Sequence, residues 1–212
     1  MARSPQRADL VRHILVGVAC LLLGWLGVMQ GVRIPILSDA SYGVHQLGHL
    51  MTWFLPEVYR LMMGSLFQVL LPLGFAGYFL LFHRDLLGVT LMLAWTGLSA
   101  GETAAYIADA TAPTMVIGPG HIEHDWAIAL TTLDKMAAVD ELAWIVQAAA
   151  LVCILVGMGV AAFGAVRAIT ESHTASAVDV YLERKPVQDR GGYDEWARAQ
   201  SGNQASPPSA GP

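Results

Sequence analysis

Two histidines four residues apart, His45 and His49, carry the clearest chemical signal in this sequence. On a helix, side chains at positions i and i+4 lie on one face, so both imidazoles can reach one ligand. This is the histidine spacing of the helical His-Glu-x-x-His zinc motif. Gln46 stands where that motif has glutamate, and its amide cannot take a proton from metal-bound water. The pair therefore predicts a metal site, with a structural histidine pair as the alternative, and leaves open whether the protein is an enzyme.

A metal site needs more than two ligands, and a second polar stretch offers them. His121, Glu123, His124 and Asp125 place four ionisable side chains within five residues. Both zinc and iron accept histidine and carboxylate ligands. His124 and Asp125 begin an expected short helix that runs to about Met136 and would anchor them. We therefore predict His45, His49, His124 and Asp125 as metal ligands, the alternative being a solvated loop.

Glu102 is a carboxyl group inside an apolar run. A carboxylate buried in a membrane is costly without a partner, so it is a candidate for function. It is our candidate base in place of the missing motif glutamate. The alternatives are an ion pair with Arg60 or a position near the water interface. Gln68, also within an apolar run, is a candidate second-sphere residue.

The composition indicates a membrane protein. The chain has 212 residues, of which 55% are hydrophobic and 14% charged, whereas soluble domains carry about 25% charged residues. The net charge is -5, and no basic face is present, so a nucleic-acid partner is not expected. Cys20 and Cys153 lie in apolar runs and are expected to be packed or lipid-facing thiols.

The fold class expected is all-α: an integral membrane helical bundle with about four transmembrane helices. Residues 14–32, 61–82, 86–108 and 142–166 are apolar runs long enough to cross a hydrocarbon core of ~30 Å. The histidine pair lies on a helix expected to start near Ala40, with Ser38 or Asp39 as its N-cap, and to end before Pro56. Because that helix is short for a full crossing, we expect a half-span or an interfacial helix.

Three regions follow from this pattern. Residues 1–13 form an N-terminal tail. Residues 14–170 form the transmembrane domain, with an outer loop at 109–137. Residues 171–212 are rich in Ser, Gly, Pro, Gln and charge, which predicts a disordered tail.

The basic residues predict the orientation. If the histidine helix does not cross, four spans place both termini on one side. That side holds nine of the twelve basic residues, the exceptions being Arg33, Arg60 and Lys135. Because Lys and Arg gather on the cytoplasmic side, both termini should be cytoplasmic. His45, His49, Glu102 and the 121–125 loop then share the outer side of the membrane.

The order of four short motifs resembles that of a group of small multi-pass bacterial membrane proteins. These proteins look distantly like intramembrane zinc metalloproteases. The motifs span residues 40–135 and are His45–His49, Gly64–Gln68, Tyr106–Ala110 and His124–Trp126. The resemblance implies a bacterial inner-membrane location and a metal held by His45, His49 and the His124/Asp125 loop. Because the group has glutamate at the position of Gln46, and because no Asn-Pro-x-x-Asp-Gly-like segment is present, proteolysis by the usual mechanism is not expected.

We therefore expect an integral membrane protein that binds zinc or iron, and that is a non-proteolytic or degenerate relative of membrane metallohydrolases. The alternative is a non-catalytic accessory subunit of a larger membrane complex, such as an electron-transfer or photosynthetic assembly. Its partners would be the lipid bilayer and other membrane proteins. Haem or quinone binding through the histidines is less well supported, since no two full spans present histidines to one another.

Overall fold

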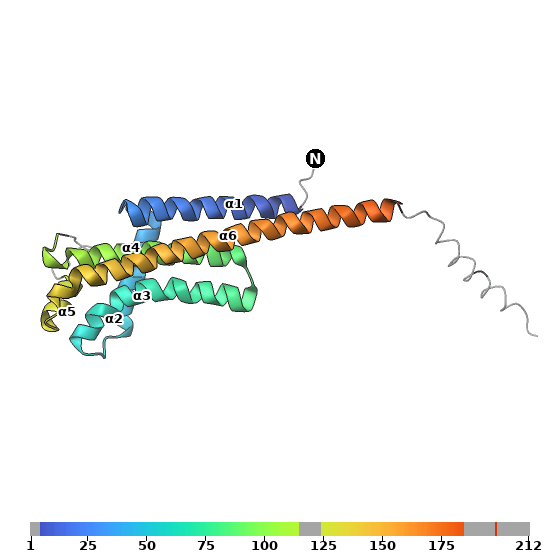
Figure 1. Ribbon diagram of the computed structural model, residues 1–212. Helices are drawn as coiled ribbons and strands as arrows, with labels where there is room; N and C mark the ends of the chain where they lie inside the picture. Colours follow the sequence, from blue (N-terminus) through green and yellow to red (C-terminus); the bar gives the residue numbers. More distant parts are fainter. Residues whose placement is uncertain (1–4, 115–123, 185–197, 199–212) are drawn as a thin grey trace, which may run out of the picture. The chain divides into compact units, whose positions relative to one another are not determined.

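The computed structural model describes residues 5–114, 124–184 and 198, and these residues form helices with no β-strand among them. Figure 1 shows α1, α3, α4 and α6 as long helices along roughly one axis, with α1 and α4 running in one direction and α3 and α6 in the other. The prediction of an all-α helical bundle is confirmed. The elements are α1 Pro5–Leu23 with its π-helical continuation η1 Gly24–Met29, α2 Pro35–Met51, α3 Glu57–Tyr78 with its π-helical continuation η2 Phe79–His83, α4 Leu86–Ala108, α5 Asp125–Thr132 and α6 Val139–Arg184.

Three helical stretches are long and apolar enough to cross a membrane: Ala8–Met29, Glu57–His83 and Met136–Thr174. They correspond to three of the four predicted spans. The fourth, α4, occupies the predicted residues but does not belong to this set. Its second half includes Ser99, Gly101, Glu102 and Thr103, which reduce its apolar character.

Helix α4 forms the core of the bundle. It packs against α1 and α3, and 15 of its 23 residues are buried. Helix α6 closes a further side, since Ala150 and Ile154 join a buried cluster with Cys20, Val28 and Ala94. The central helix therefore tolerates small and polar residues because protein, rather than lipid, surrounds most of it.

Helix α2 starts earlier than predicted. It begins at Pro35, whose ring presets the backbone angle of a first helical residue. Ser38 lies within the helix and accepts a hydrogen bond from the backbone N–H of Ile34 at 3.2 Å, so the prediction that Ser38 or Asp39 is the N-cap was wrong. The helix has 17 residues, or about 26 Å, which is short of a full crossing.

Helix α6 extends further than predicted. It continues through residues 171–184, where we had predicted disorder. The stretch contains no helix-breaking residue, since the first proline or glycine after Thr170 is Pro186. The chain divides into two compact units at Ile169 and Thr170. The remaining predicted tail lies outside the described residues, except for Arg198.

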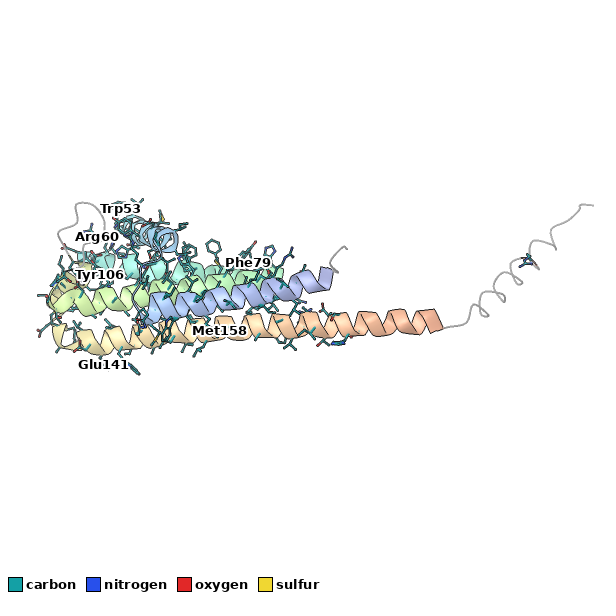
Figure 2. The ribbon with its side chains drawn as sticks, turned by 90° about the horizontal axis from the view of Figure 1, so that it is seen from above. Trp53, Arg60, Phe79, Tyr106, Glu141 and Met158 are labelled. Atoms are coloured by element: carbon teal, nitrogen blue, oxygen red, sulfur yellow. The ribbon has the colours of Figure 1, made fainter. Side chains whose placement is uncertain are left out.

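The polar groups gather at one end of the bundle. Helix α4 ends there, while α3, α5 and α6 begin there (Figure 1). Figure 2 shows Arg60, Tyr106 and Glu141 near this end, with Phe79 well away from it along the bundle. Three segments that are distant in sequence therefore meet at one level of the bundle.

Candidate metal centre

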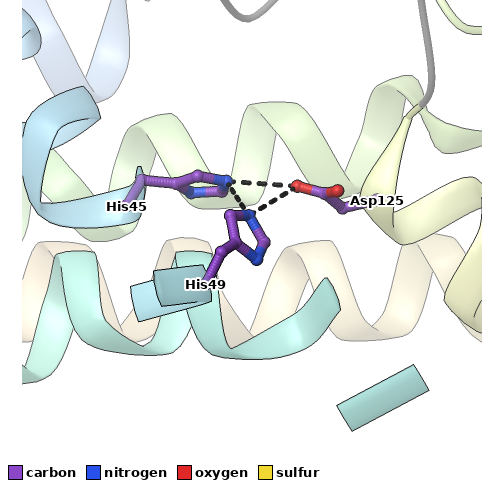
Figure 3. Close-up of side chains that lie close together, drawn as sticks. All are labelled: His45, His49 and Asp125. Atoms are coloured by element: carbon purple, nitrogen blue, oxygen red, sulfur yellow. Dashed lines mark hydrogen bonds and ion pairs between the residues drawn. The ribbon is translucent and has the colours of Figure 1, made fainter. Parts of the chain in front are cut away.

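His45, His49 and Asp125 bring three ligand atoms together (Figure 3). The two Nε2 atoms lie 3.0 Å apart. Oδ2 of Asp125 lies 3.1 Å from Nε2 of His45 and 3.3 Å from Nε2 of His49. Ligand atoms about 2.0–2.1 Å from a tetrahedral zinc ion are themselves about 3.3 Å apart. The three atoms are therefore spaced as the ligands of one small metal ion.

The outer nitrogen of each imidazole faces a hydrogen-bond acceptor. Nδ1 of His45 lies 3.2 Å from Oε1 of Gln68, and Nδ1 of His49 lies 2.9 Å from the carbonyl oxygen of Arg60. Gln68 is itself oriented, because its Nε2 donates to Oε2 of Glu102 at 3.2 Å. Each Nδ1 is therefore the donor, and in the neutral rings each Nε2 carries a lone pair.

Two nitrogen lone pairs and one carboxylate oxygen consequently converge on the same point. Such a group repels itself unless a cation or a proton lies among its members. Metal-binding histidines generally donate their other N–H to a carbonyl or carboxylate, as both rings do here. The residues present thus fit a metal ion in both their ligand atoms and the groups behind them.

Two glycines make room for the imidazoles between α2 and α3. A Cβ atom at Gly64 would lie 2.5 Å from Nε2 of His49 and 2.6 Å from Nε2 of His45. A Cβ atom at Gly48 would lie 2.5 Å from the carbonyl oxygen of Met63. The close approach of the two helices, and the space that the rings occupy, therefore require glycine at both positions.

Helix α5 brings the carboxylate to the histidines. Nε1 of Trp126 donates to Oγ of Ser65 on α3 at 3.0 Å. The backbone N–H of Asp125 donates to the hydroxyl of Tyr106 on α4 at 3.0 Å. These two contacts attach the first turn of α5 to both neighbouring helices and fix the position of the Asp125 side chain.

The charges of the site shift the pKa values of its residues. Burial would raise the pKa of Asp125, but its interactions with the imidazoles of His45 and His49 outweigh burial and hold that pKa well below its usual range. The hydrogen bond to Asp125 raises the pKa of His49, although burial opposes it. Without a metal ion, a proton on His49 is therefore favoured beside the Asp125 carboxylate.

The structure places His124 away from the three ligand atoms. Its Nδ1 accepts a hydrogen bond from the backbone N–H of Ala127 at 3.2 Å and so caps α5. Its Nε2 lies 3.5 Å from Oδ2 of Asp109, and its ring lies 4.0 Å from that of Tyr106. Burial lowers the pKa of His124. His124 therefore positions Asp125 through the helix cap, and the ligand role predicted for it has no support in this geometry.

Glu102 also lies apart from the ligand atoms. Its carboxyl group accepts hydrogen bonds from the hydroxyl of Ser38 and the amide of Gln68. Gln68 in turn contacts the outer nitrogen of His45. Glu102 thus orients a ring through an intermediate residue, instead of standing beside the ligand atoms as the predicted base would. His121 and Glu123 lie outside the described residues.

Sequence reasoning missed two contributors to the site. Gly64 was noted only as part of a motif, although the space it leaves is needed by both rings. Its position in the first half of a span, next to the polar Ser65, was the available signal. The Arg60 carbonyl that orients His49 left no signal, because a backbone oxygen is present at every residue.

No family model matches the sequence, and no curated protein or solved structure matches it either. The likeness to small membrane proteins with a His-Glu-x-Gly-His motif therefore stays a prediction from the motifs alone.

Proposed function

We propose that this protein is an integral membrane protein that holds one metal ion with His45, His49 and Asp125. The observation that supports this most strongly is the convergence of their three ligand atoms within 3.3 Å. Both outer imidazole nitrogens donate away from that point, toward Gln68 and Arg60. An unpartnered histidine pair gives no reason for both rings to be oriented in this way.

Zinc is the first ion to test and iron the second. Two histidines and one carboxylate form catalytic zinc sites and also the facial triad of non-haem iron proteins. A metal of this kind, when bound, can act as a Lewis acid. Gln46 cannot serve as a base, and Glu102 lies behind His45. We therefore propose a structural or regulatory site in a degenerate relative of membrane metallohydrolases.

Metal analysis of the purified protein tests the proposal. Protein extracted in mild detergent without chelators is expected to carry about one zinc or iron ion per chain. His45→Ala, His49→Ala and Asp125→Asn should each remove it. His83→Ala is the matched control, because His83 hydrogen-bonds to Tyr78 at the other end of α3. A metal-free wild-type protein, or retention of the metal in all three variants, would contradict the proposal.

The variant Gln46→Glu tests the relation to metallohydrolases. Restoring the motif glutamate should give peptidase activity on a denatured membrane-protein substrate if the active-site architecture is otherwise retained. The variant Gln46→Glu with His45→Ala is the control and should be inactive. Activity in both variants would point to a contaminating protease.

We further propose that both termini are cytoplasmic in a bacterial inner membrane, with the metal centre near the outer face. This is supported by Arg12 in the first half of α1 and by Arg84 between η2 and α4. Figure 1 shows the starts of α1 and α4 at the opposite end of the bundle from α5. In a background lacking Cys20 and Cys153, a cysteine at position 135 should react with an impermeant maleimide in spheroplasts. A cysteine at position 84 should react only after lysis, and the opposite pattern would reverse the orientation.

A role as an accessory subunit of a membrane complex is a second candidate, favoured by the length of α6. The helix has 46 residues, or about 69 Å, whereas a bilayer core needs only ~30 Å. The helix is therefore longer than a bilayer crossing needs, and its excess length is available for contact with another protein. Partners that copurify with the full chain, and are lost when residues 175–212 are deleted, would support this role.

A further inference from the structure

A cavity of about 990 Å³ lies beside the metal centre. It is bounded by η1, the start of α2, the second half of α4 and the start of α6. On α4 its wall consists of small side chains, including Gly101, Ala105 and Ala108. None of the three proposed metal ligands lines it. Its volume is within the range of small-molecule binding sites, about 300–1,000 Å³, and it is therefore a second candidate site.

Two polar groups of α4 line this cavity. Thr103 is 5% exposed, and its hydroxyl has no hydrogen-bond partner. The neighbouring Glu102 accepts from Ser38 and Gln68, while a carboxylate has about four acceptor positions. The Thr103 hydroxyl oxygen is itself enclosed by protein, so the acceptor that a ligand in the cavity meets is Glu102, with its remaining acceptor positions.

The cavity also includes residues suited to the membrane–water interface. Arg33 and Asp39 form an exposed ion pair, with side chains 69% and 64% exposed. Trp144 is 72% exposed and lies close to the start of the α6 span. Exposed tryptophans near the ends of membrane spans sit at the level of lipid head groups. The cavity thus combines a headgroup-level region with an apolar wall.

The charges favour one class of ligand. Asp39 and Glu102 provide two carboxyl groups against the single guanidinium of Arg33, and all three line the cavity. An ammonium group donates hydrogen bonds and carries the complementary charge, whereas a carboxylate head group would meet an excess of like charge. A long apolar chain would cover the alanine and glycine wall of α4.

We propose that this cavity binds a membrane lipid with an ammonium head group, which donates hydrogen bonds to Glu102. The site is separate from the metal centre, because Gln68 and Tyr106 lie between the cavity and the ligand atoms. Because Glu102 also supports His45 through Gln68, loss of metal and loss of lipid binding are told apart with variants that leave Glu102 unchanged, such as Ala105→Leu.

Native mass spectrometry of the full chain, released from a neutral detergent, tests the proposal. The probes are dodecylamine, dodecanol and laurate, which share a chain length and differ in their head groups. At pH 7.5 the wild-type protein should retain one dodecylamine at a concentration at least ten-fold below that needed for laurate, with dodecanol in between.

Three variants locate the binding. Ala105→Leu places a larger side chain at an exposed position of the cavity wall and should abolish retention of dodecylamine. Thr103→Val removes the hydroxyl at nearly constant volume and should leave retention near the wild-type level, because the enclosed hydroxyl does not contact the ligand. Glu102→Gln should remove the preference for the amine over the alcohol. Gly74→Ala, at an open position of α3 outside the cavity, is the control and should behave as the wild type.

Equal retention of all three probes, unchanged in Ala105→Leu, would indicate lipid bound around the bundle and overturn the proposal. A preference for laurate would also overturn it. Metal content measured on the same samples of Ala105→Leu should stay at the wild-type level. A wild-type protein without metal that still selects dodecylamine would refute the metal centre and leave the lipid site standing.

Discussion

His45 and His49 each use one ring nitrogen to determine the state of the other. Hydrogen bonds from Nδ1 to Gln68 and to the Arg60 carbonyl leave both Nε2 lone pairs directed toward Asp125. The spacing of the two histidines and the carboxylate of Asp125 were predicted from the sequence. The groups behind them were less accessible to prediction, because they depend on how α2 packs on α3.

Gly64→Ala is expected to weaken metal binding by about 10–100-fold, as changes behind metal ligands commonly do. The added methyl group would lie 2.5–2.6 Å from both Nε2 atoms and would displace the rings. Gly74→Ala is the matched control on the same helix, since no atom lies within 4 Å of its added methyl group. Competition with a zinc-binding dye gives both affinities, and equal values would contradict the geometry.

Metal binding is expected to release protons and to strengthen as the pH rises. The hydrogen bond to Asp125 raises the pKa of His49 above its usual value, which is about 6.5. Below that raised pKa a metal ion must displace the proton from Nε2, so the apparent affinity falls as the pH decreases. Calorimetry in buffers of different ionisation enthalpy should show proton release on metal binding, and the number of protons released should increase as the pH is lowered from 8 to 6. A pH-independent affinity between pH 6 and 8 would contradict this.

Helix α5 is short, and its position depends on the contacts made by its first turn. It has eight residues, and its first one is Asp125. Helices of this length are not stable by themselves, so the contacts of Trp126 with Ser65 and of His124 with Ala127 hold it in place. The position of the Asp125 carboxylate therefore depends on the N-cap that His124 forms.

His124→Ala is expected to lower stability by about 0.5–2 kcal/mol through loss of the cap. His124→Asn should retain most of that stability, because asparagine is a good N-cap. Metal stoichiometry should remain at the wild-type level in His124→Asn, since His124 is not a ligand in this geometry. Thermal unfolding with metal analysis separates the two effects, and complete loss of metal in His124→Asn would return His124 to the ligand set.

The sequence predicted helices better than it predicted their ends. The residues of α4 match the predicted span, because a long apolar run leaves few alternatives. The start of α2 was placed near Ala40, since the preference of Ser38 and Asp39 for N-caps outweighed the signal from Pro35. The continuation of α6 to Arg184 was missed, because the composition of the whole tail concealed a stretch without proline or glycine.

For the whole molecule, a bound metal ion would join α2 to α5 across 80 residues of sequence. A ligand that binds only the folded state at 100 times its Kd adds about 2.7 kcal/mol of stability. In a chain of this size, that corresponds to roughly 5–10 °C in Tm. The number of spans and the loop charges predicted that the polar groups would gather at one end of the bundle. The sequence did not predict how deeply α2 packs into the bundle.

Chelation is therefore expected to lower the Tm of the wild-type protein by several degrees in detergent, and added zinc should restore it. His45→Ala is the control: its Tm should be lower from the start and should not respond to chelator. The His83→Ala variant should respond as the wild type does. A chelator effect of equal size in His45→Ala would assign the stabilisation to a different metal site.

The absent side chain at Gly64 has a use beyond this protein. A pair of histidines at i and i+4 shows by itself only that two imidazoles share one face of a helix. Here the facing helix has a glycine, Gly64, 15 residues after the second histidine. The missing side chain of Gly64 leaves the space that the two imidazoles occupy. A search of other genomes for both features together would separate chains that build this centre from those that share only the spacing, whatever residue follows the first histidine.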